Sequence, residues 1–136
     1  MRDGVPSGTS FVVSFARGLG LDDRPIDPVA PDLLPFWLAW LAGAPQKLGG
    51  AAPLFRWAIR ASSLGLVDHA VLRTQAIDAH LSSALESGID QIVLLGAGLD
   101  ARAWRLPELA RTTGFEVDHP AAQADKGAGS GGRAPD

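Results

Sequence analysis

Cysteine is absent from the chain, which excludes disulfide bonds, thiolate metal sites and cysteine nucleophiles. The three histidines, His69, His80 and His119, form no pair at the spacing of metal ligands, so we expect no metal ion. Long apolar runs are absent too: the longest, 33–44, is interrupted by Pro35 and falls short of the ~20 residues that span a bilayer. Since the first residues show no signal-peptide pattern, the sequence predicts a cytoplasmic protein without a membrane partner.

The chain also lacks a large net charge of either sign. The 136 residues include 12 lysines and arginines, scattered along the chain, and 15 aspartates and glutamates, so we expect no nucleic-acid partner. Hydrophobic residues make up 46% of the chain, enough for the core of one compact domain. Residues 127–136 are an exception, because their Gly, Ala and Ser residues bury too little apolar surface to offset the entropy of ordering. We expect a disordered tail there.

Helical patterns fill the first two thirds of the chain, and we expect a helical amino-terminal cap over residues 1–88. A short helix is expected over 9–19 and a loop over 20–31. The next helix is expected to begin at Asp32 as N-cap, with Pro35 tolerated in its first turn, and to run to about Ala42. It is apolar on nearly every side, which indicates either burial in a core or the wall of a substrate pocket. Two more helices are expected, over 54–64 and 68–88.

The pattern then changes to that of an α/β fold. Residues 91–95 form a short, continuously apolar run, which is typical of a parallel strand covered on both faces. A second strand is expected over 114–117, after a helical or irregular segment over 101–110. The sequence therefore predicts the first β-α-β unit of a Rossmann-like sheet over residues 89–126.

A glycine loop follows the first strand at Gly96-Ala97-Gly98. Glycines at this place allow a sharp turn and close approach of a nucleotide-like cofactor. Asp118, which is 20 residues beyond Gly98, ends the second strand, where a carboxylate can accept hydrogen bonds from both ribose hydroxyls. The loop also satisfies the dinucleotide-binding pattern, so its glycines alone leave S-adenosylmethionine and NAD open. The long helical region before the first strand favours methyl transfer.

These residues resemble the leucine carboxyl methyltransferase-like family of class I methyltransferases, especially its bacterial branch of polyketide O-methyltransferases. The resemblance is carried by residues 72–78, 91–106, 115–120 and Lys126 and extends in outline from Thr9. It implies that S-adenosylmethionine is the cofactor and that a methyl group is transferred to a carboxylate or hydroxyl of a small molecule. The catalytic residues are unknown, because the chain offers no candidate general base.

The resemblance also implies roles for individual residues. Arg73 would pair with the methionine carboxylate of the cofactor, Gly96, Ala97 and Gly98 would pass beside its methionine and ribose portions, and Asp118 would hold the ribose hydroxyls. From the residues alone, the alternative is that Arg73 is a solvated helix residue paired with a nearby acid. Arg102 and Arg105 are expected to pair with Asp100 or Glu108 and to fix the loop, and the histidines are expected to be structural.

The family-like sequence ends at Lys126, before the strands that would complete the sheet. Two parallel strands alone would leave apolar surface and an open edge exposed. We therefore expect a truncated family member, either completed by another chain or encoded by a shifted reading frame. The alternatives are a noncatalytic cofactor-binding or interaction fragment and, ranked last, part of a nicotinamide-dependent oxidoreductase.

Overall fold

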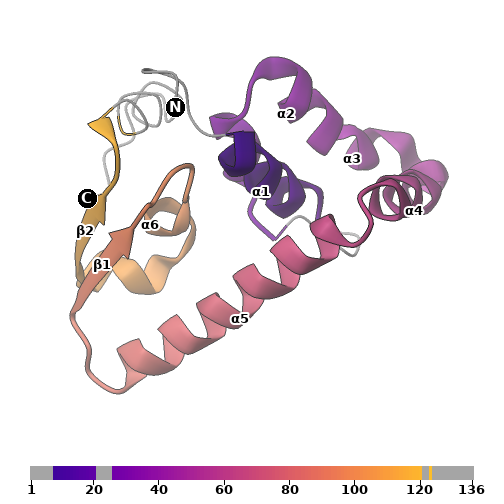
Figure 1. The fold of residues 1–136 in the computed structure, drawn as a ribbon. Helices are drawn as coiled ribbons and strands as arrows, with labels where there is room; N and C mark the ends of the chain where they lie inside the picture. The colour runs from indigo at the N-terminus through magenta and orange to yellow at the C-terminus, as the bar shows by residue number, and fades with distance from the viewer. Residues whose placement is uncertain (1–7, 21–25, 121–122, 124–136) are drawn as a thin grey trace.

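The computed structural model describes residues 8–20, 26–120 and 123, so the expected tail over 127–136 and Lys126 lie outside the described residues. The described part is mostly helical and ends in two parallel strands (Figure 1). None of its helices is long and apolar enough to cross a membrane. In chain order the elements are α1 (Gly8–Leu19), the 3-10 turn η1 (Ala30–Leu33), α2 (Phe36–Ala42), α3 (Ala44–Leu48), the 3-10 turn η2 (Gly49–Ala51), α4 (Ala52–Ser62), α5 (Leu66–Glu86), β1 (Gln91–Leu95), α6 (Arg102–Arg105), the 3-10 turn η3 (Pro107–Arg111) and β2 (Thr113–Val117).

Helix α5 joins the helical region to the strands, and α1 packs against its first half (Figure 1). Apolar side chains three or four residues apart form one stripe on each helix, which is the spacing of a buried helix face. The stripes meet in a core cluster of Ala16, Leu19, Val67, Ala70 and Val71, and Phe55 and Ile59 of α4 pack against it. This core fixes α1 along α5.

The end of α5 is set by Gly88, as the sequence predicts. Gly88 has a φ of +92°, a left-handed conformation that glycine adopts readily. Its amide donates to the carbonyl oxygen of Leu85 at 3.0 Å, and the amide of Ile89 donates to that of Ala84 at 3.3 Å. These two bonds form a Schellman motif, which ends the helix and directs the chain into β1.

The helix expected to begin at Asp32 is instead two elements, so the prediction of Asp32 as N-cap was wrong. Leu34 is extended, with φ −99° and ψ 151°, and it separates η1 from α2. The cause is Pro35, whose ring disfavours the helical conformation for the residue before it. Pro35 is itself the N-cap of α2.

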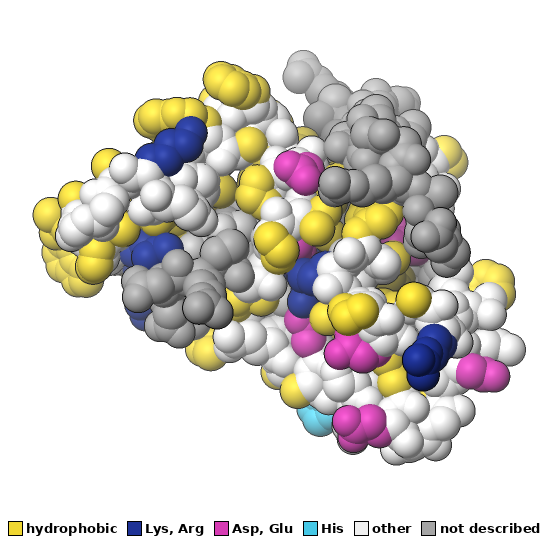
Figure 2. Space-filling view, turned by 180° about the vertical axis from the view of Figure 1, so that it is seen from behind, with side chains coloured by type: hydrophobic (Ala, Val, Ile, Leu, Met, Phe, Trp, Pro, Cys, Tyr) yellow, Lys and Arg dark blue, Asp and Glu magenta, His cyan; other side chains and the backbone are white. Residues whose placement is uncertain are grey.

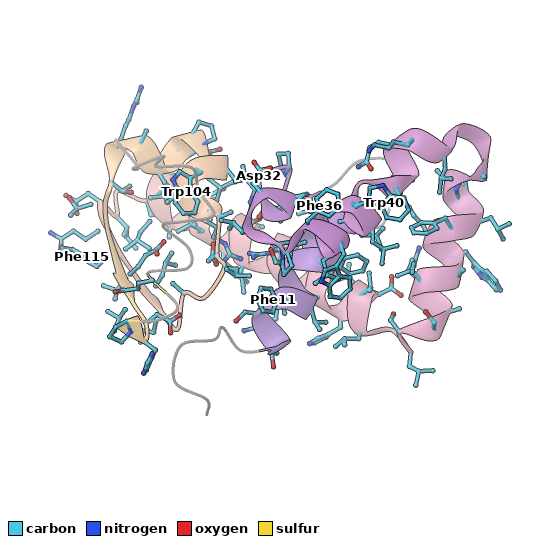
Figure 3. All side chains as sticks on the ribbon, turned by 90° about the horizontal axis from the view of Figure 1, so that it is seen from above. Phe11, Asp32, Phe36, Trp40, Trp104 and Phe115 are labelled. Carbon is cyan, nitrogen blue, oxygen red and sulfur yellow. The ribbon has the colours of Figure 1, made fainter. Side chains whose placement is uncertain are left out.

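Of the two alternatives for this helix, burial in a core is wrong for the aromatic residues of α2. Phe36, Trp37 and Trp40 are 85%, 64% and 58% exposed. Figure 3 shows Phe36 and Trp40 on the helical part of the molecule, and Figure 2 shows hydrophobic side chains on the surface of that part. The contact with α1 is instead made by small residues: a Cβ on Gly18 would lie 3.4 Å from the Cβ of Ala42. Helices approach closely through small residues, and the aromatic side chains then point away.

Strands β1 and β2 form where the sequence predicts them, and they pair in parallel with Gln91 opposite Thr113 and Leu95 opposite Val117. Paired residues share a face of the sheet. Val93, Leu95, Phe115 and Val117 are all more than half exposed. Apolar surface is thus left uncovered, as expected for two parallel strands without the rest of a sheet. The outcome is a two-stranded parallel sheet with one open apolar face, a partial α/β fold.

The core between α1 and α5 leads to a stability prediction. Leu19→Ala should lower the free energy of unfolding by about 2–5 kcal/mol, because Leu19 is fully buried and the change leaves a cavity. The matched control is Leu54→Ala on α4, where the leucine is mostly exposed and the change should stay within about 0.5 kcal/mol. Urea unfolding followed by circular dichroism measures both; equal effects would mean that this cluster is not the core.

Candidate functional site

The glycine loop follows directly from β1. The amide of Gly96 donates to the carbonyl oxygen of Val117 at 2.7 Å, and the amide of Asp100 donates to that of Ala97 at 2.8 Å. Gly98 has a φ of +51°, and a Cβ there would lie 3.0 Å from the hydroxyl oxygen of Ser10 on α1. Residue 98 therefore needs glycine both for its backbone conformation and for the close approach of α1.

Asp118 lies beside this loop. One of its carboxylate oxygens, Oδ2, accepts a hydrogen bond from the amide of Gly98, and Oδ1 accepts one from the amide of His119 at 2.6 Å. The residues meet because both follow the carboxyl ends of neighbouring parallel strands, which is where α/β sheets bind nucleotide ligands. The Asp118 side chain is thus held at the loop by two backbone amides, one from the loop and one from the residue that follows Asp118.

A cavity of about 550 Å³ opens between α1, α5 and the loop, a volume typical of small-molecule sites. Arg73, Gly96, Ala97 and Gly98 line it, whereas Asp118 is not among its lining residues and reaches it through Gly98. The wall also includes polar residues of α1 and α5, namely Thr9, Ser10, Arg17, His69 and Thr74. The structure therefore brings the cofactor residues expected from the sequence to one region.

Arg73 projects from the middle of α5 and is exposed. It makes no ion pair with any of the residues that the structure describes. Gly96 lines the same cavity, and a Cβ added to it would meet no other atom within 4 Å. The cavity thus presents an arginine fork, suited to bind a carboxylate, together with exposed loop backbone.

The segment after the loop is held by ion pairs. Arg102 pairs with Asp100, as the sequence predicts, and its Nε also lies 2.7 Å from Oδ1 of Asp78 on α5. Arg105 places Nη1 2.8 Å from Oδ2 of the same Asp78 carboxylate. The partner expected from the sequence, Glu108, is in neither pair.

Sequence reasoning missed Asp78 as the shared partner of these arginines. The signal was present, because Asp78 occupies the same helical stripe as Thr74, Ile77 and Leu81, which is spaced for an inward-facing side. A charge at an inward-facing helix position needs a partner of opposite sign. Burial raises the pKa of Asp78, but the hydrogen bonds from Arg105 and Arg102 outweigh it and leave the pKa below its usual value.

All three histidines are exposed, and His69 also lines the cavity. Among the described residues no group of three or more His, Asp or Glu side chains is arranged to hold a metal ion.

A glycine loop after the first parallel strand, with a carboxylate after the second and a cavity beside the loop, is the arrangement typical of nucleotide-binding α/β units. Residues 26–128 match the model of the leucine carboxyl methyltransferase family, and the chain belongs to this family.

Curated relatives agree with this family. One from Mycobacterium avium (strain 104) is 36% identical over 118 residues, covering 82% of this chain and 38% of that protein. One from Mycobacteroides abscessus is 32% identical over 115 residues, and one from Mycobacterium sp. (strain MCS) is 50% identical over 56 residues, 41% of this chain and 23% of that protein. Each is named "Putative S-adenosyl-L-methionine-dependent methyltransferase". The chain spans well under half the length of these relatives.

The shared carboxylate of Asp78 predicts a pH dependence. Its lowered pKa contributes stability that is fully present above the unfolded value, near pH 4, and is lost as the pH falls through the folded pKa. Asp78→Asn should therefore lower the free energy of unfolding by about 3 kcal/mol at neutral pH and by less in acid.

Urea unfolding of the parent chain and of Asp78→Asn between pH 2 and 7 measures this difference. The control is Asp90→Asn, because Asp90 is exposed before β1, and it should leave the acid limb unchanged. A constant difference at all pH values would show that the Asp78 charge does not stabilise the fold.

Proposed function

We propose that this chain carries the first half of the S-adenosylmethionine site of an O-methyltransferase that acts on a carboxylate or hydroxyl of a small molecule. The observation that carries the proposal is the cavity with Arg73 on one side and the loop Gly96–Gly98 on the other, with Asp118 bound to that loop. Membership of the leucine carboxyl methyltransferase family supports the reaction class. Residues 1–88 would act as a cap over the cofactor portion that begins at residue 89.

The residues present fit this cofactor at its amino-acid and ribose portions. Arg73 would hold the methionine carboxylate through charge-assisted hydrogen bonds, which a guanidinium supplies at any physiological pH. Asp118 would accept hydrogen bonds from the ribose hydroxyls. Its carboxylate accepts from the amides of Gly98 and His119, and an ionised carboxylate offers about four acceptor positions in all.

The bound cofactor would supply an electrophilic methyl group, and this chain would contribute binding and orientation. Positioning the reacting groups is itself a large part of such catalysis. The adenine pocket and the acceptor site would come from further polypeptide, since the relatives are much longer than the matched region. Binding without turnover by this chain would favour the alternative of a noncatalytic cofactor-binding fragment.

The role of Arg73 is tested by titrating the chain with S-adenosylhomocysteine in a calorimeter. Arg73→Ala should weaken binding by about tenfold to a hundredfold, because hydrogen bonds between charged groups are lost. Arg111→Ala is the matched control, since Arg111 is an exposed arginine on η3. Equal affinities of the two variants would refute the assignment, and no saturable binding by the folded parent chain would contradict the proposed function.

The role of Asp118 is tested with Asp118→Asn, which keeps an amide oxygen to accept from Gly98 but removes the charge. We expect a loss of S-adenosylhomocysteine affinity of about tenfold or more, because the ribose hydroxyls lose a charged acceptor. Glu108→Gln on η3 serves as the control for removal of an exposed carboxylate. Preferential binding of NAD by the parent chain would instead favour the oxidoreductase alternative.

A further inference from the structure

Arg17 connects the helical cap to the glycine loop. It lies in the last turn of α1, and only 4% of its surface is exposed. Its Nη2 donates a hydrogen bond of 2.6 Å to the carbonyl oxygen of Leu99, 82 residues later in the sequence. Leu99 directly follows Gly98, so the bond is made to the first residue after the glycine loop.

The same guanidinium approaches the next residue as well. Its Nη1 lies 3.9 Å from Oδ2 of Asp100, and the amide of Asp100 in turn closes the loop on Ala97. One side chain therefore faces two consecutive residues at the point where the loop leaves the cavity.

The segment around Asp27 holds both the backbone and the side chain of Arg17. Its carbonyl oxygen accepts hydrogen bonds from the amides of Ile26 and Asp27, at 3.1 and 3.2 Å. Its Nε lies 3.9 Å from Oδ2 of the fully buried Asp27, whose Oδ1 accepts bonds from the amides of Val29 and Ala30. Burial lowers the pKa of Arg17, while Asp100 and Asp27 oppose this effect. The guanidinium stays charged, because arginine is not deprotonated in proteins.

Arg17 belongs to a network that balances charge between the cap and the cofactor segment. Arg105 connects two of its aspartates: its Nε lies 3.4 Å from Oδ2 of Asp27, and its Nη1 lies 2.8 Å from Oδ2 of Asp78. The members are three arginines and three aspartates, so their formal charges cancel: Arg17, Asp27, Asp78, Asp100, Arg102 and Arg105. Arg17 is the only member of this network on α1.

We propose that Arg17 is a positioning residue of the cofactor site, which holds the loop at residues 98–100 in its binding shape by bonding the Leu99 carbonyl. The proposal rests on the proposed function of the loop as the cofactor site. It makes the docking of α1 a condition for cofactor affinity. Arg17 acts through the loop, so it should affect every cofactor portion that the loop contacts.

The first test measures amide hydrogen exchange in the unliganded chain by NMR. Arg17→Met should accelerate exchange of the Gly98 and Asp100 amides by about tenfold or more, while amides in α5 change less. The control is Arg56→Met on α4, since Arg56 is equally buried, at 5% exposure, in another part of the cap. If Arg17→Met does not fold, Arg17→Lys is measured instead, because it keeps the charge and loses the fork.

Equal acceleration in the loop and in α5, or the same pattern in the Arg56 variant, would overturn the proposal. Faster exchange confined to the loop would support it, even if the parent chain failed to bind S-adenosylhomocysteine. In that case only the proposed function would fail.

The second test compares two ligands by calorimetry. One is S-adenosylhomocysteine and the other is 5′-methylthioadenosine, which lacks the amino-acid portion. Arg17→Met should weaken both by a similar factor, about tenfold, because it disturbs the loop. Arg73→Ala should weaken S-adenosylhomocysteine alone. Unchanged affinities in the Arg17 variant, with a parent chain that binds both ligands, would overturn the proposal and leave the proposed function intact.

Discussion

The arrangement of this chain depends on charges that are shared across the junction between its helices and its first strand. Asp78 accepts from both Arg102 and Arg105, and Arg17 of α1 donates to the carbonyl oxygen of Leu99. Buried ion pairs add little net stability, because the cost of removing both charges from water offsets their attraction. Leaving one member unpaired is expensive, however. The network therefore favours one relative placement of cap and loop over others more than it favours folding itself.

The helices are assembled on a different principle. Alanine and glycine carry the contact between α1 and α2, where Gly18 approaches Ala42, and the larger aromatic side chains of α2 remain outside. Hydrophobic burial is concentrated instead in the cluster around Leu19 and Val71. Binding of α1 to α5 through this cluster sets the direction in which Arg17 points. The apolar core thus positions α1, and the ionic network then connects α1 to the glycine loop.

The sequence predicted the features that depend on local pattern. The period of α5, the stop at Gly88 and the strand at 91–95 are all governed by neighbours in the chain, and all three are confirmed. The helix beginning at Asp32 was predicted wrongly, because the apolar pattern was given more weight than the constraint that Pro35 places on Leu34. Side-chain partners across the junction were only partly predictable. Arg102 with Asp100 is a local pair, whereas Asp78 required knowledge of where α5 passes.

The boundary expected at residue 88 separates two patterns of sequence, but the contacts of the cofactor loop cross it. Gly98 is covered by Ser10, and Leu99 is bonded by Arg17, both from α1. A cap that merely lay over a finished site could shift without changing the loop. Here the first helix supplies the donor that fixes a loop carbonyl, and the last turn of that helix is itself held by Asp27. The shape of the loop is therefore a property of both regions together, and neither pattern specifies it alone.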